Sequence, residues 1–504
     1  MGISGQNSKI KPAPQTITVQ KVVVPAKTKP RSSLGPNSNS NSSNSSNSKS
    51  NGLRAPSSSR AGGASSSRLS PNPKFARTKS ASPYPSSSDE KRAAERKRKA
   101  VASTPRDSPA FFDDDDDSED DEDDDPFRKR RKLIDETGDA NRKLRHKRAF
   151  DEKIRDSRIV HAAQLASVET DCEPIFGAKK DEVAVELQYP SRCKPEKYEL
   201  VWKKDRIDAV ADILKVVKHV AETYLTEDEA QPFIDNQTSF RRRMERASNE
   251  NIHDLAAFKT ALEDYNKKLI SLVESGTIAK NIDRRHRVPP ELVDFILTQV
   301  YDRTVAPKVE LLNKYQAGSD NVYGELRYPF VRHILHEHCH MTSDQVYVDL
   351  GSGVGNTVLQ AALEIGCRSY GCEIVPQSCD FADAQLEEFK SRCLLWGLAP
   401  GRAHLERADF RQNPKMSQVL KEADVILVNN KAFTPQLNKA LTDMFLDLKT
   451  GCKIISLKNF VLGNEKNSTN DVANSILDVE GHRYQGDWVS WASSDGEYFV
   501  STKR

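Results

Sequence analysis

The stretch that most constrains the fold is residues 346–356, VYVDLGSGVGN. Its first five residues read as a short apolar strand, Gly351, Gly353 and Gly355 follow at once, and a helical pattern begins at Asn356. Glycines let a ligand approach the backbone closely, and the start of a helix adds a positive dipole. The sequence therefore predicts a strand–turn–helix unit that binds a ligand.

Strand-like and helix-like segments alternate downstream of this unit. The pattern predicts strands at 346–350, 368–374, 403–408, 424–428 and 453–457, and helices at 356–365, 376–396 and 435–448. Such alternation indicates a parallel sheet with helices on both faces. Near the end, the segments 488–491 and 498–501 flank the turn-forming residues 493–496, which predicts a closing antiparallel hairpin.

The residues at the predicted strand ends favour one ligand class. The dinucleotide pattern G-x-G-x-x-G fails because Asn356 stands in place of its third glycine. The carboxylate of Asp349 would repel a pyrophosphate but suits the cationic amino-acid end of S-adenosyl-L-methionine. Glu373 ends the next strand, where a carboxylate can bind both ribose hydroxyls. Asp409 and Phe410 follow the third strand, where an acid can accept from the adenine amino group while a ring packs on the base.

Together, these features predict an α/β fold with the seven-stranded sheet of a class I S-adenosylmethionine-dependent methyltransferase. We place this methyltransferase domain at residues 321–504. Residues 180–320 precede it and are predicted as a mostly helical subdomain. A strand is expected at 183–187, and apolar residues recur at helical spacing in 205–228, 253–275 and 288–315.

Residues 1–160 are of low complexity and are expected to form a disordered arm. Residues 37–51 are almost entirely Ser and Asn, a composition that cannot bury enough apolar surface to offset chain entropy. The chain carries 76 Lys and Arg against 73 Asp and Glu, but the arm separates basic clusters at 91–99 and 128–132 from an acidic run at 113–125. The basic clusters indicate nuclear import and DNA binding; a solvated tail without a fixed partner is the alternative. The acidic run could bind histones or shield the arm.

Several function classes are disfavoured. The 8 cysteines show no disulfide or C-x-x-C spacing, and no apolar run approaches the roughly 18 residues needed to span a membrane. We therefore expect a soluble intracellular protein without a membrane partner. His333, His336 and His340 share a predicted helical face and could suggest zinc, but no second ligand cluster lies nearby in sequence, so ordinary histidines and no bound metal are expected.

Four ordered motifs resemble one family. The segments 323–326 (YGEL), 349–356, 429–433 (NNKAF) and 489–491 (VSW) with Tyr498 resemble the disruptor-of-telomeric-silencing methyltransferases of fungal type. These are histone H3 lysine methyltransferases without a SET domain. The resemblance covers roughly residues 180–504. It implies methyl transfer to a lysine on the globular face of H3 in nucleosomes, with roles in telomeric silencing, transcription and the DNA-damage checkpoint, together with a nuclear location. The expected partners are the nucleosome, with H3 and other core histones, and DNA through the basic arm; we expect a monomer.

The resemblance also implies residue roles. The expected S-adenosyl-L-methionine-binding residues are Tyr323, Gly324, Glu325, Leu326, Tyr347, Val348, Asp349, Leu350, Gly351, Ser352, Gly353, Val354, Gly355, Asn356, Glu373, Asp409 and Phe410. The residues expected to border the channel for the substrate lysine are Asn429, Phe433, Ser456, Trp491 and Tyr498.

One position departs from the family pattern. The usual motif is Asn-Asn-Phe-Ala-Phe, whereas Lys431 replaces the first Phe here. A cation near the channel could repel the incoming lysine, although a stem that points outward would make the effect small. This departure motivates one alternative, a catalytically silent chromatin-binding protein with this fold. A second alternative, a methyltransferase acting on RNA or a small molecule, predicts a motif such as Pro-Pro-Tyr after the fourth strand, where this chain has Asn429 and Asn430.

Overall fold

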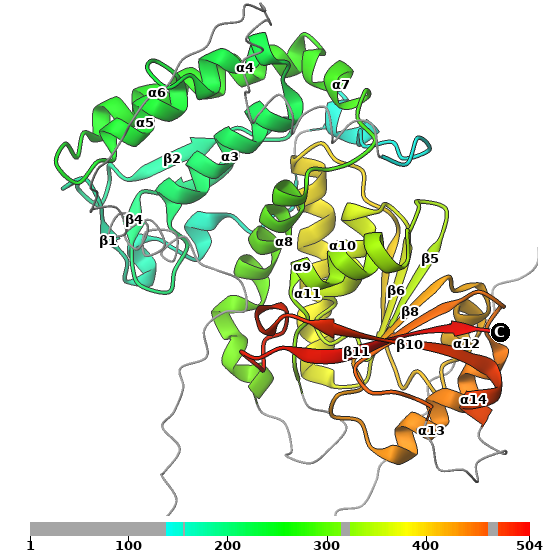
Figure 1. Ribbon diagram of the computed structural model, residues 1–504. Coiled ribbons are helices and arrows are strands. Elements are labelled where there is room, and N and C mark those ends of the chain that lie inside the picture. Colours follow the sequence, from blue (N-terminus) through cyan, green and yellow to red (C-terminus); the bar gives the residue numbers. More distant parts are fainter. Residues whose placement is uncertain (1–137, 155–156, 314–322, 462–471) are drawn as a thin grey trace, which may run out of the picture. The chain divides into compact units, whose positions relative to one another are not determined.

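The structure is a computed structural model that describes residues 138–154, 157–313, 323–461 and 472–504 (Figure 1). Most of the predicted arm, with its basic clusters and its acidic run, lies outside the described residues. Within the described part of the chain, no helix combines the length and the apolar character that crossing a membrane would require.

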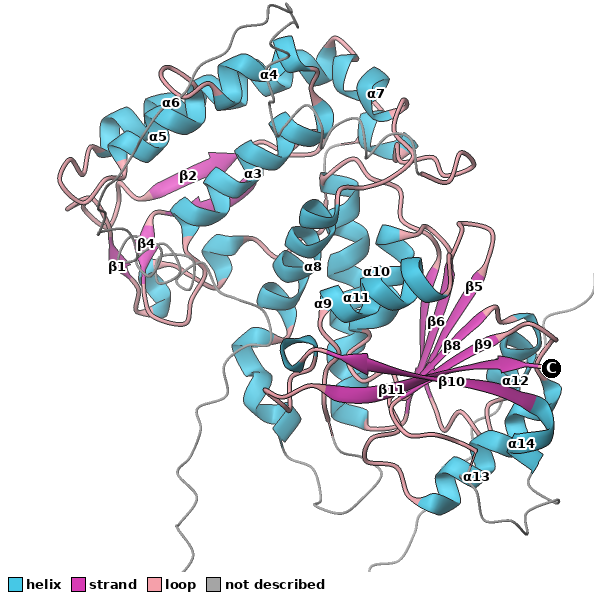
Figure 2. Ribbon diagram, in the orientation of Figure 1, coloured by secondary structure: helices cyan, strands magenta, loops and turns pink. Residues whose placement is uncertain are grey.

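A seven-stranded sheet carries the C-terminal half of the described chain (Figure 2). Its strands are β5 (Val346–Leu350), β6 (Arg368–Glu373), β7 (Ala403–Arg407), β8 (Val425–Val428), β9 (Lys453–Ser456), β10 (Leu477–Tyr484) and β11 (Gly496–Lys503). The spatial order is β10-β11-β9-β8-β5-β6-β7. Strands β5 to β9 pair in parallel, and β11 pairs antiparallel with both β9 and β10. The predicted α/β sheet is confirmed.

Helices cover both faces of this sheet. They are α9 (Tyr328–His333), α10 (Asn356–Glu364), α11 (Pro376–Leu395), α12 (Pro414–Glu422), α13 (Pro435–Met444) and α14 (Val472–Ile476). Side chains alternate along each strand, so Val348 and Ile426 pack with α12 and α13 on one face. Tyr347 and Leu427 point to the other face, where α9 and α10 lie.

The predicted antiparallel hairpin at the end of the chain is present, but its first strand lies at other residues than predicted. The partner of β11 is β10 (Leu477–Tyr484), whereas residues 488–491 form a loop after a short 3-10 turn at Gly486–Trp488. Strand β10 alternates only weakly between buried and exposed positions, because one edge of the sheet ends there. The tryptophans at 488 and 491 gave the loop a false resemblance to a strand.

The region before the sheet is mostly helical and also contains short strands. The strands are β1 (Glu173–Pro174), β2 (Ala184–Leu187), β3 (Glu196–Glu199) and β4 (Val201–Trp202). The helices are α3 (Ala209–Tyr224), α4 (Glu227–Ile234), α5 (Phe240–Ala247), α6 (Leu255–Glu274), α7 (Thr277–Ile282) and α8 (Pro290–Thr304). The helix expected at 288–315 ends at Thr304, and a 3-10 segment at Ala306–Asn313 follows it.

The expected disordered arm ends earlier than residue 160. Leu144 and Ala149 are buried in the core, and the N–H of Ala399 donates to the carbonyl of Leu144 at 2.7 Å. Arg145 forms an isolated bridge with Leu398. The few apolar residues of this charged stretch carry no periodic pattern, so their packing could not be predicted from the sequence.

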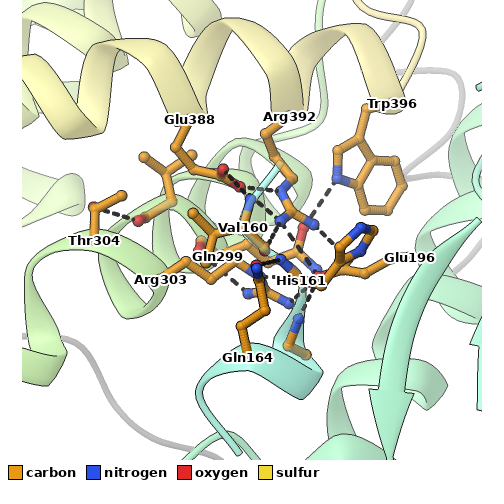
Figure 3. Close-up of polar contacts among 12 residues, drawn as sticks. Val160, His161, Gln164, Glu196, Gln299, Arg303, Thr304, Glu388, Arg392 and Trp396 are labelled. Atoms are coloured by element: carbon orange, nitrogen blue, oxygen red, sulfur yellow. Dashed lines mark hydrogen bonds and ion pairs between the residues drawn. The ribbon is translucent and has the colours of Figure 1, made fainter. Parts of the chain in front are cut away.

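A buried ionic network ties α8 and α11 to strand β3 (Figure 3). Arg303 of α8 contacts Glu196 of β3 at 3.0 Å, and Arg392 of α11 contacts the same carboxylate and also Glu388 at 2.6 Å. Trp396 donates from its indole nitrogen to Gln299 of α8 at 3.0 Å. Because α8 also belongs to the core that includes α10 and α11, the predicted boundary near residue 320 does not separate two hydrophobic cores.

Candidate cofactor site and active centre

A cavity of about 550 Å³ opens at the carboxyl ends of the central parallel strands. This is where ligands bind in open α/β sheets, since the strand order reverses there. The predicted site residues that line it are Tyr323, Gly324, Glu325, Leu326, Asp349, Gly351, Ser352, Gly353, Val354, Asn356, Glu373, Asp409, Phe410, Asn429 and Phe433. Residues from five separate segments of the chain thus meet at one cavity.

Four of the predicted cofactor-binding residues do not line the cavity. Tyr347, Val348 and Leu350 are fully buried strand residues whose side chains pack between the sheet and its helices. Gly355 forms the N-cap of α10 with a φ of 92°. Their part is to place the glycine turn, and the sequence motif alone could not separate that part from ligand contact.

The glycine turn has a backbone that only glycine adopts easily. Gly351 and Gly353 have φ values of 87° and 54°. A Cβ atom on Gly353 would come within 2.9 Å of the Tyr323 ring, and one on Gly351 within 3.4 Å of the Phe433 ring. The turn therefore leaves its backbone open to a ligand and draws two aromatic rings close to it.

Glu373 holds the turn from the end of β6. One of its carboxylate oxygens accepts from the N–H of Gly353 at 2.9 Å. The other accepts from the N–H groups of Ile374 and Val375 at 2.9 and 2.8 Å. The carboxylate is fixed at the cavity wall, with lone pairs left for hydroxyl donors.

Asp349 is almost completely buried at the end of β5. Burial raises the pKa of Asp349 to about 7, and the negative charge of Glu373 also raises it, while a hydrogen bond from the Thr357 hydroxyl lowers it. No cation in the described structure neutralises this carboxylate. A positively charged ligand group in the cavity would do so.

Glu325 is the second buried carboxylate at the cavity. Its Oε1 accepts from the hydroxyls of Tyr323 and Tyr301 and, at 3.2 Å, from the Asn356 amide. Its Oε2 is buried without a hydrogen-bond partner among the described residues. Burial raises the pKa of Glu325 to about 7, although its three donors favour the carboxylate form. The unpartnered oxygen suits an ammonium donor.

Asp409 and Phe410 occupy the far end of the cavity, after β7. The Arg411 guanidinium contacts both oxygens of Asp409, at 2.9 and 2.6 Å, and holds the pKa of that carboxyl below its usual range. Phe410 is buried against the core on the α12 side of the sheet. A carboxylate accepts several hydrogen bonds, so Asp409 keeps acceptor capacity for an exocyclic amine.

Two residues of the predicted substrate channel line the cavity. Asn429 follows β8, and its amide donates to the carbonyl of Gly324 at 3.1 Å. Its neighbour Asn430 is fully buried and accepts from the N–H groups of Leu457 and Lys458 at 2.9 and 2.8 Å. Asn430 therefore fixes the turn that presents Asn429 and Phe433.

The other three predicted channel residues lie outside the cavity lining. Trp491 packs against Gly324 at its border, so close that a Cβ atom there would lie 2.6 Å from the ring. Ser456 ends β9, with a buried hydroxyl that has no partner among the described residues. The Tyr498 hydroxyl contacts His338 Nε2 at 2.5 Å, on the α9 face of the sheet. Tyr498 is therefore not among the residues that line the cavity, and its neighbour Phe499 pairs with Ser456 in the adjacent strand.

The histidines that suggested zinc lie apart from this cavity. His336 contacts Glu364 at 3.0 Å, and His338 packs against His482 with tilted rings whose centroids lie 4.4 Å apart. Among the described residues, no group of three His, Cys, Asp or Glu side chains is arranged to hold a metal ion.

Sequence reasoning missed several groups at the site. Tyr301 comes from α8, outside the predicted methyltransferase domain, and reaches the Glu325 carboxylate at 3.2 Å. Thr357 bonds to Asp349, and Leu311 and Leu312 line the cavity. Only Thr357 stood near a recognised motif. The others reach the site through tertiary packing, which no local signal reports.

The fold and the cavity define a class. A doubly wound sheet with an antiparallel end strand, a glycine turn and buried carboxylates at successive strand ends fits a cofactor with a cationic amino-acid end and a nucleoside. Glu325 and Asp349 fit the cationic end, and Glu373 fits ribose hydroxyls. These are the features of a class I methyltransferase that uses S-adenosyl-L-methionine.

Comparison with known proteins narrows the class. The family described as "Histone methylation protein DOT1" matches residues 301–503. A Gibberella zeae protein named "Histone-lysine N-methyltransferase, H3 lysine-79 specific" is 53% identical over 436 residues, which cover 85% of this chain and 88% of that protein. Proteins of the same name from Chaetomium globosum and Emericella nidulans are 53% and 44% identical, and the matches cover 75% and 72% of this chain and 73% and 74% of theirs. A solved RNA methyltransferase from Salinibacter ruber covers 36% of this chain and 92% of its own, at 19% identity and a TM-score of 0.25, too low to bear on function.

The chain belongs to the DOT1 family of histone methylation proteins. It is a histone methyltransferase, and its cofactor is S-adenosyl-L-methionine.

Proposed function

We propose that the protein transfers methyl groups from S-adenosyl-L-methionine to lysine 79 of histone H3 in the nucleosome. The observation that carries the proposal is the Glu325 carboxylate at the cavity, buried and with one oxygen unpartnered among the described residues. The relatives with 53% identity are named as specific for this lysine, which supports the choice of substrate.

Different residues of the cavity would bind different parts of the cofactor. Glu325 and Asp349 would bind the cationic amino-acid end, Glu373 the ribose hydroxyls, and Asp409 with Phe410 the adenine. When bound, the cofactor supplies an electrophilic methyl group on a sulfonium. The protein's task is then positioning, which by itself can lower a barrier by about 7–11 kcal/mol.

The substrate amine must lose its proton before it can attack. A lysine amine has a reference pKa of about 10.4, and a dry apolar channel favours its neutral form. Phe433 and Trp491 would form the apolar walls of this channel, and Asn429 would lie beside it. The hydroxyl of Ser456, which is buried at the end of β9 without a partner among the described residues, would offer the amine a hydrogen bond. Water takes the proton.

The arm adds affinity for nucleosomal DNA and directs the protein, a monomer, to the nucleus. Its basic clusters would release counterions from phosphates, so nucleosome binding should weaken steeply with salt. A chain that starts at Gly138 keeps the buried residues Leu144 and Ala149. It should therefore fold, bind nucleosomes less tightly than the full chain, and show a shallower dependence on salt.

A methyl-transfer assay tests the catalytic proposal. Labelled cofactor would be offered with intact nucleosomes, nucleosomes whose H3 carries arginine at position 79, free histones and RNA. We expect transfer to the first substrate alone, and its loss in Asp349→Ala but not in the matched surface variant Asp383→Ala. Equal labelling of the arginine nucleosomes would refute lysine 79 as the acceptor. Labelling of RNA alone would refute a histone substrate, and no labelling at all would favour a silent chromatin-binding protein.

A further inference from the structure

The segment that carries Trp491 crosses the cofactor loop of residues 323–327 as an antiparallel partner. Leu326 pairs with Val489 in an isolated bridge. The N–H of Arg327 donates to the carbonyl of Trp488 at 2.9 Å. Two segments more than 150 residues apart in the chain therefore move as one unit unless this pairing breaks.

Ser490 makes the next contact along this pairing, and it uses its side chain. The N–H of Glu325 donates to the Ser490 hydroxyl oxygen at 2.9 Å. The N–H of Ser490 donates back to the carbonyl of Glu325, also at 2.9 Å. Both main-chain polar groups of Glu325 are therefore satisfied by one serine.

Different functional groups lie on the two sides of this serine. On one side is the Glu325 carboxylate, which is buried and has one oxygen without a partner among the described residues. On the other side is the Trp491 ring, which packs on Gly324 and is 36% exposed. The Asn429 amide holds the carbonyl of the same Gly324 at 3.1 Å.

We propose that Ser490 is a positioning residue that couples cofactor binding at Glu325 to the placement of Trp491. When the cationic end of the cofactor binds the free oxygen of Glu325, the backbone of that residue is fixed. The two Ser490 hydrogen bonds then transmit that restraint to the loop that carries the tryptophan. The channel wall is thereby held more firmly when a methyl donor is present. This inference rests on the proposed function of the cavity.

Coupling of this kind is reciprocal, because binding free energies are linked. A variant that breaks the link should lose both cofactor affinity and the response of the tryptophan loop. In Ser490→Ala the N–H of Glu325 keeps its place but loses its acceptor, and an unsatisfied buried donor should weaken cofactor binding about tenfold. Ser490→Thr keeps the hydroxyl and suits an extended backbone.

The experiment uses the full chain and S-adenosyl-L-homocysteine, which carries the same amino-acid end as the cofactor. Calorimetry gives the affinity, and hydrogen exchange of residues 486–492 reports the ordering of the loop. In the wild type, the ligand should slow exchange there. Ser490→Ala loses the side-chain bond but keeps its main-chain bond to the carbonyl of Glu325, so it should bind about tenfold more weakly and show clearly less slowing than the wild type at saturation. Ser490→Thr should restore both properties, and Ser494→Ala, an exposed serine of the same loop, should match the wild type.

Each outcome decides between the inference and what it rests on. If Ser490→Ala binds as tightly as the wild type, or keeps full protection at saturation, the coupling is refuted while the cofactor assignment stands. If Ser490→Thr fails to restore the response, the hydroxyl is not the link. A wild-type chain that does not bind the ligand refutes the cofactor assignment and the coupling together.

Discussion

Two sets of buried carboxylates in this protein differ in their charge partners. Glu196 lies between Arg303 and Arg392; although burial opposes its charge, the two guanidiniums lower the pKa of Glu196 to about 2. Glu325 and Asp349 are buried as well, but no cation pairs with either among the described residues, and burial raises the pKa of each to about 7. We call the first set the complete cluster, because its carboxylates have guanidinium partners, and the second set the incomplete cluster, because its carboxylates have no ion-pair partner among the described residues.

This difference separates a structural cluster from a binding site. Both clusters contain perturbed pKa values, so perturbation alone identifies neither as functional. A buried charge without a partner costs free energy in the folded state, and a ligand of opposite charge can recover it. The incomplete cluster lines a cavity, whereas the complete one is closed by side chains (Figure 3).

The largest expected effect is on the complete cluster. Arg392→Met keeps an unbranched apolar stem but leaves Glu388 without its guanidinium and Glu196 with one of two. Removing one partner of a buried ion pair costs about 3–5 kcal/mol, so the free energy of unfolding measured in urea should fall by that amount. Arg407→Met, which breaks exposed contacts with Asp380 and Asp383, is the matched control and should leave the free energy of unfolding close to the wild-type value, because water screens exposed ion pairs. Equal losses in the two variants would contradict the distinction between these pairs.

The incomplete cluster should respond in the opposite way. Glu325→Gln keeps the shape of the side chain and removes a charge that forms no ion pair among the described residues, although the positive charge of Arg327 also lowers the pKa of Glu325. Stability without ligand should be unchanged or slightly higher, while cofactor binding should weaken on the order of 30-fold, because a hydrogen bond to a charged group contributes about 1.5–3 kcal/mol. Calorimetry and urea unfolding measure the two quantities. Glu387→Gln, at an exposed glutamate of α11, should leave both near wild type; a large loss of stability in Glu325→Gln would place this residue with the structural cluster.

The cofactor half of the site could be predicted from the sequence because its residues follow strand ends. Strand periodicity located the ends, and the topology of a parallel sheet brings them to one edge. Asp349, Glu373 and Asp409 therefore met at the cavity as expected. The same reasoning could not find Tyr301, because the packing of α8 on the sheet's helices depends on the buried ionic network and leaves no local pattern.

The channel half was harder to predict because a side chain's direction depends on register. In a strand, a shift of one residue exchanges the two faces. Tyr498 pairs with His482 and points toward α9, while Phe499 takes the position beside Ser456. The motif located the strand, and the register of that strand decides which face each of its side chains takes. The loop that carries Trp491 differs from the predicted strand because tryptophan and valine, which favour strands, also occur in loops.

A smaller effect is expected in the pH dependence of cofactor binding to the incomplete cluster. The pKa values of Glu325 and Asp349 are raised to about 7, from reference values of 4.5 and 3.8. The contribution of these two groups to the stability of the ligand-free protein is therefore fully present below those reference values and is lost as pH rises through 7. A bound cation favours the carboxylates, so binding near pH 6 should release protons and weaken as pH falls, by at most about tenfold per pH unit for each proton released. Calorimetry in two buffers of different ionisation enthalpy counts these protons.

The contribution of Glu196 runs the other way. The pKa of Glu196 is lowered from 4.5 to about 2, so its contribution to stability is present above 4.5 and is lost as pH falls toward 2. Acid unfolding should therefore report the complete cluster, and ligand-linked proton release the incomplete one. Release that is undiminished in Glu325→Gln would show that Asp349 alone titrates on binding.

The smallest expected effect is at Lys431, a cation that needs no partner because it is exposed. The turn at this position is fixed by Asn430, whose side chain bonds across to Leu457 and Lys458, so the direction of the Lys431 stem does not depend on aromatic packing. Lys431→Phe should therefore change methyl transfer to nucleosomes by no more than about twofold, since water screens a charge at the surface. Trp491→Ala serves as the contrast and should lower transfer much further. A tenfold gain of methyl transfer in Lys431→Phe would mean that this cation repels the substrate amine even though it is exposed.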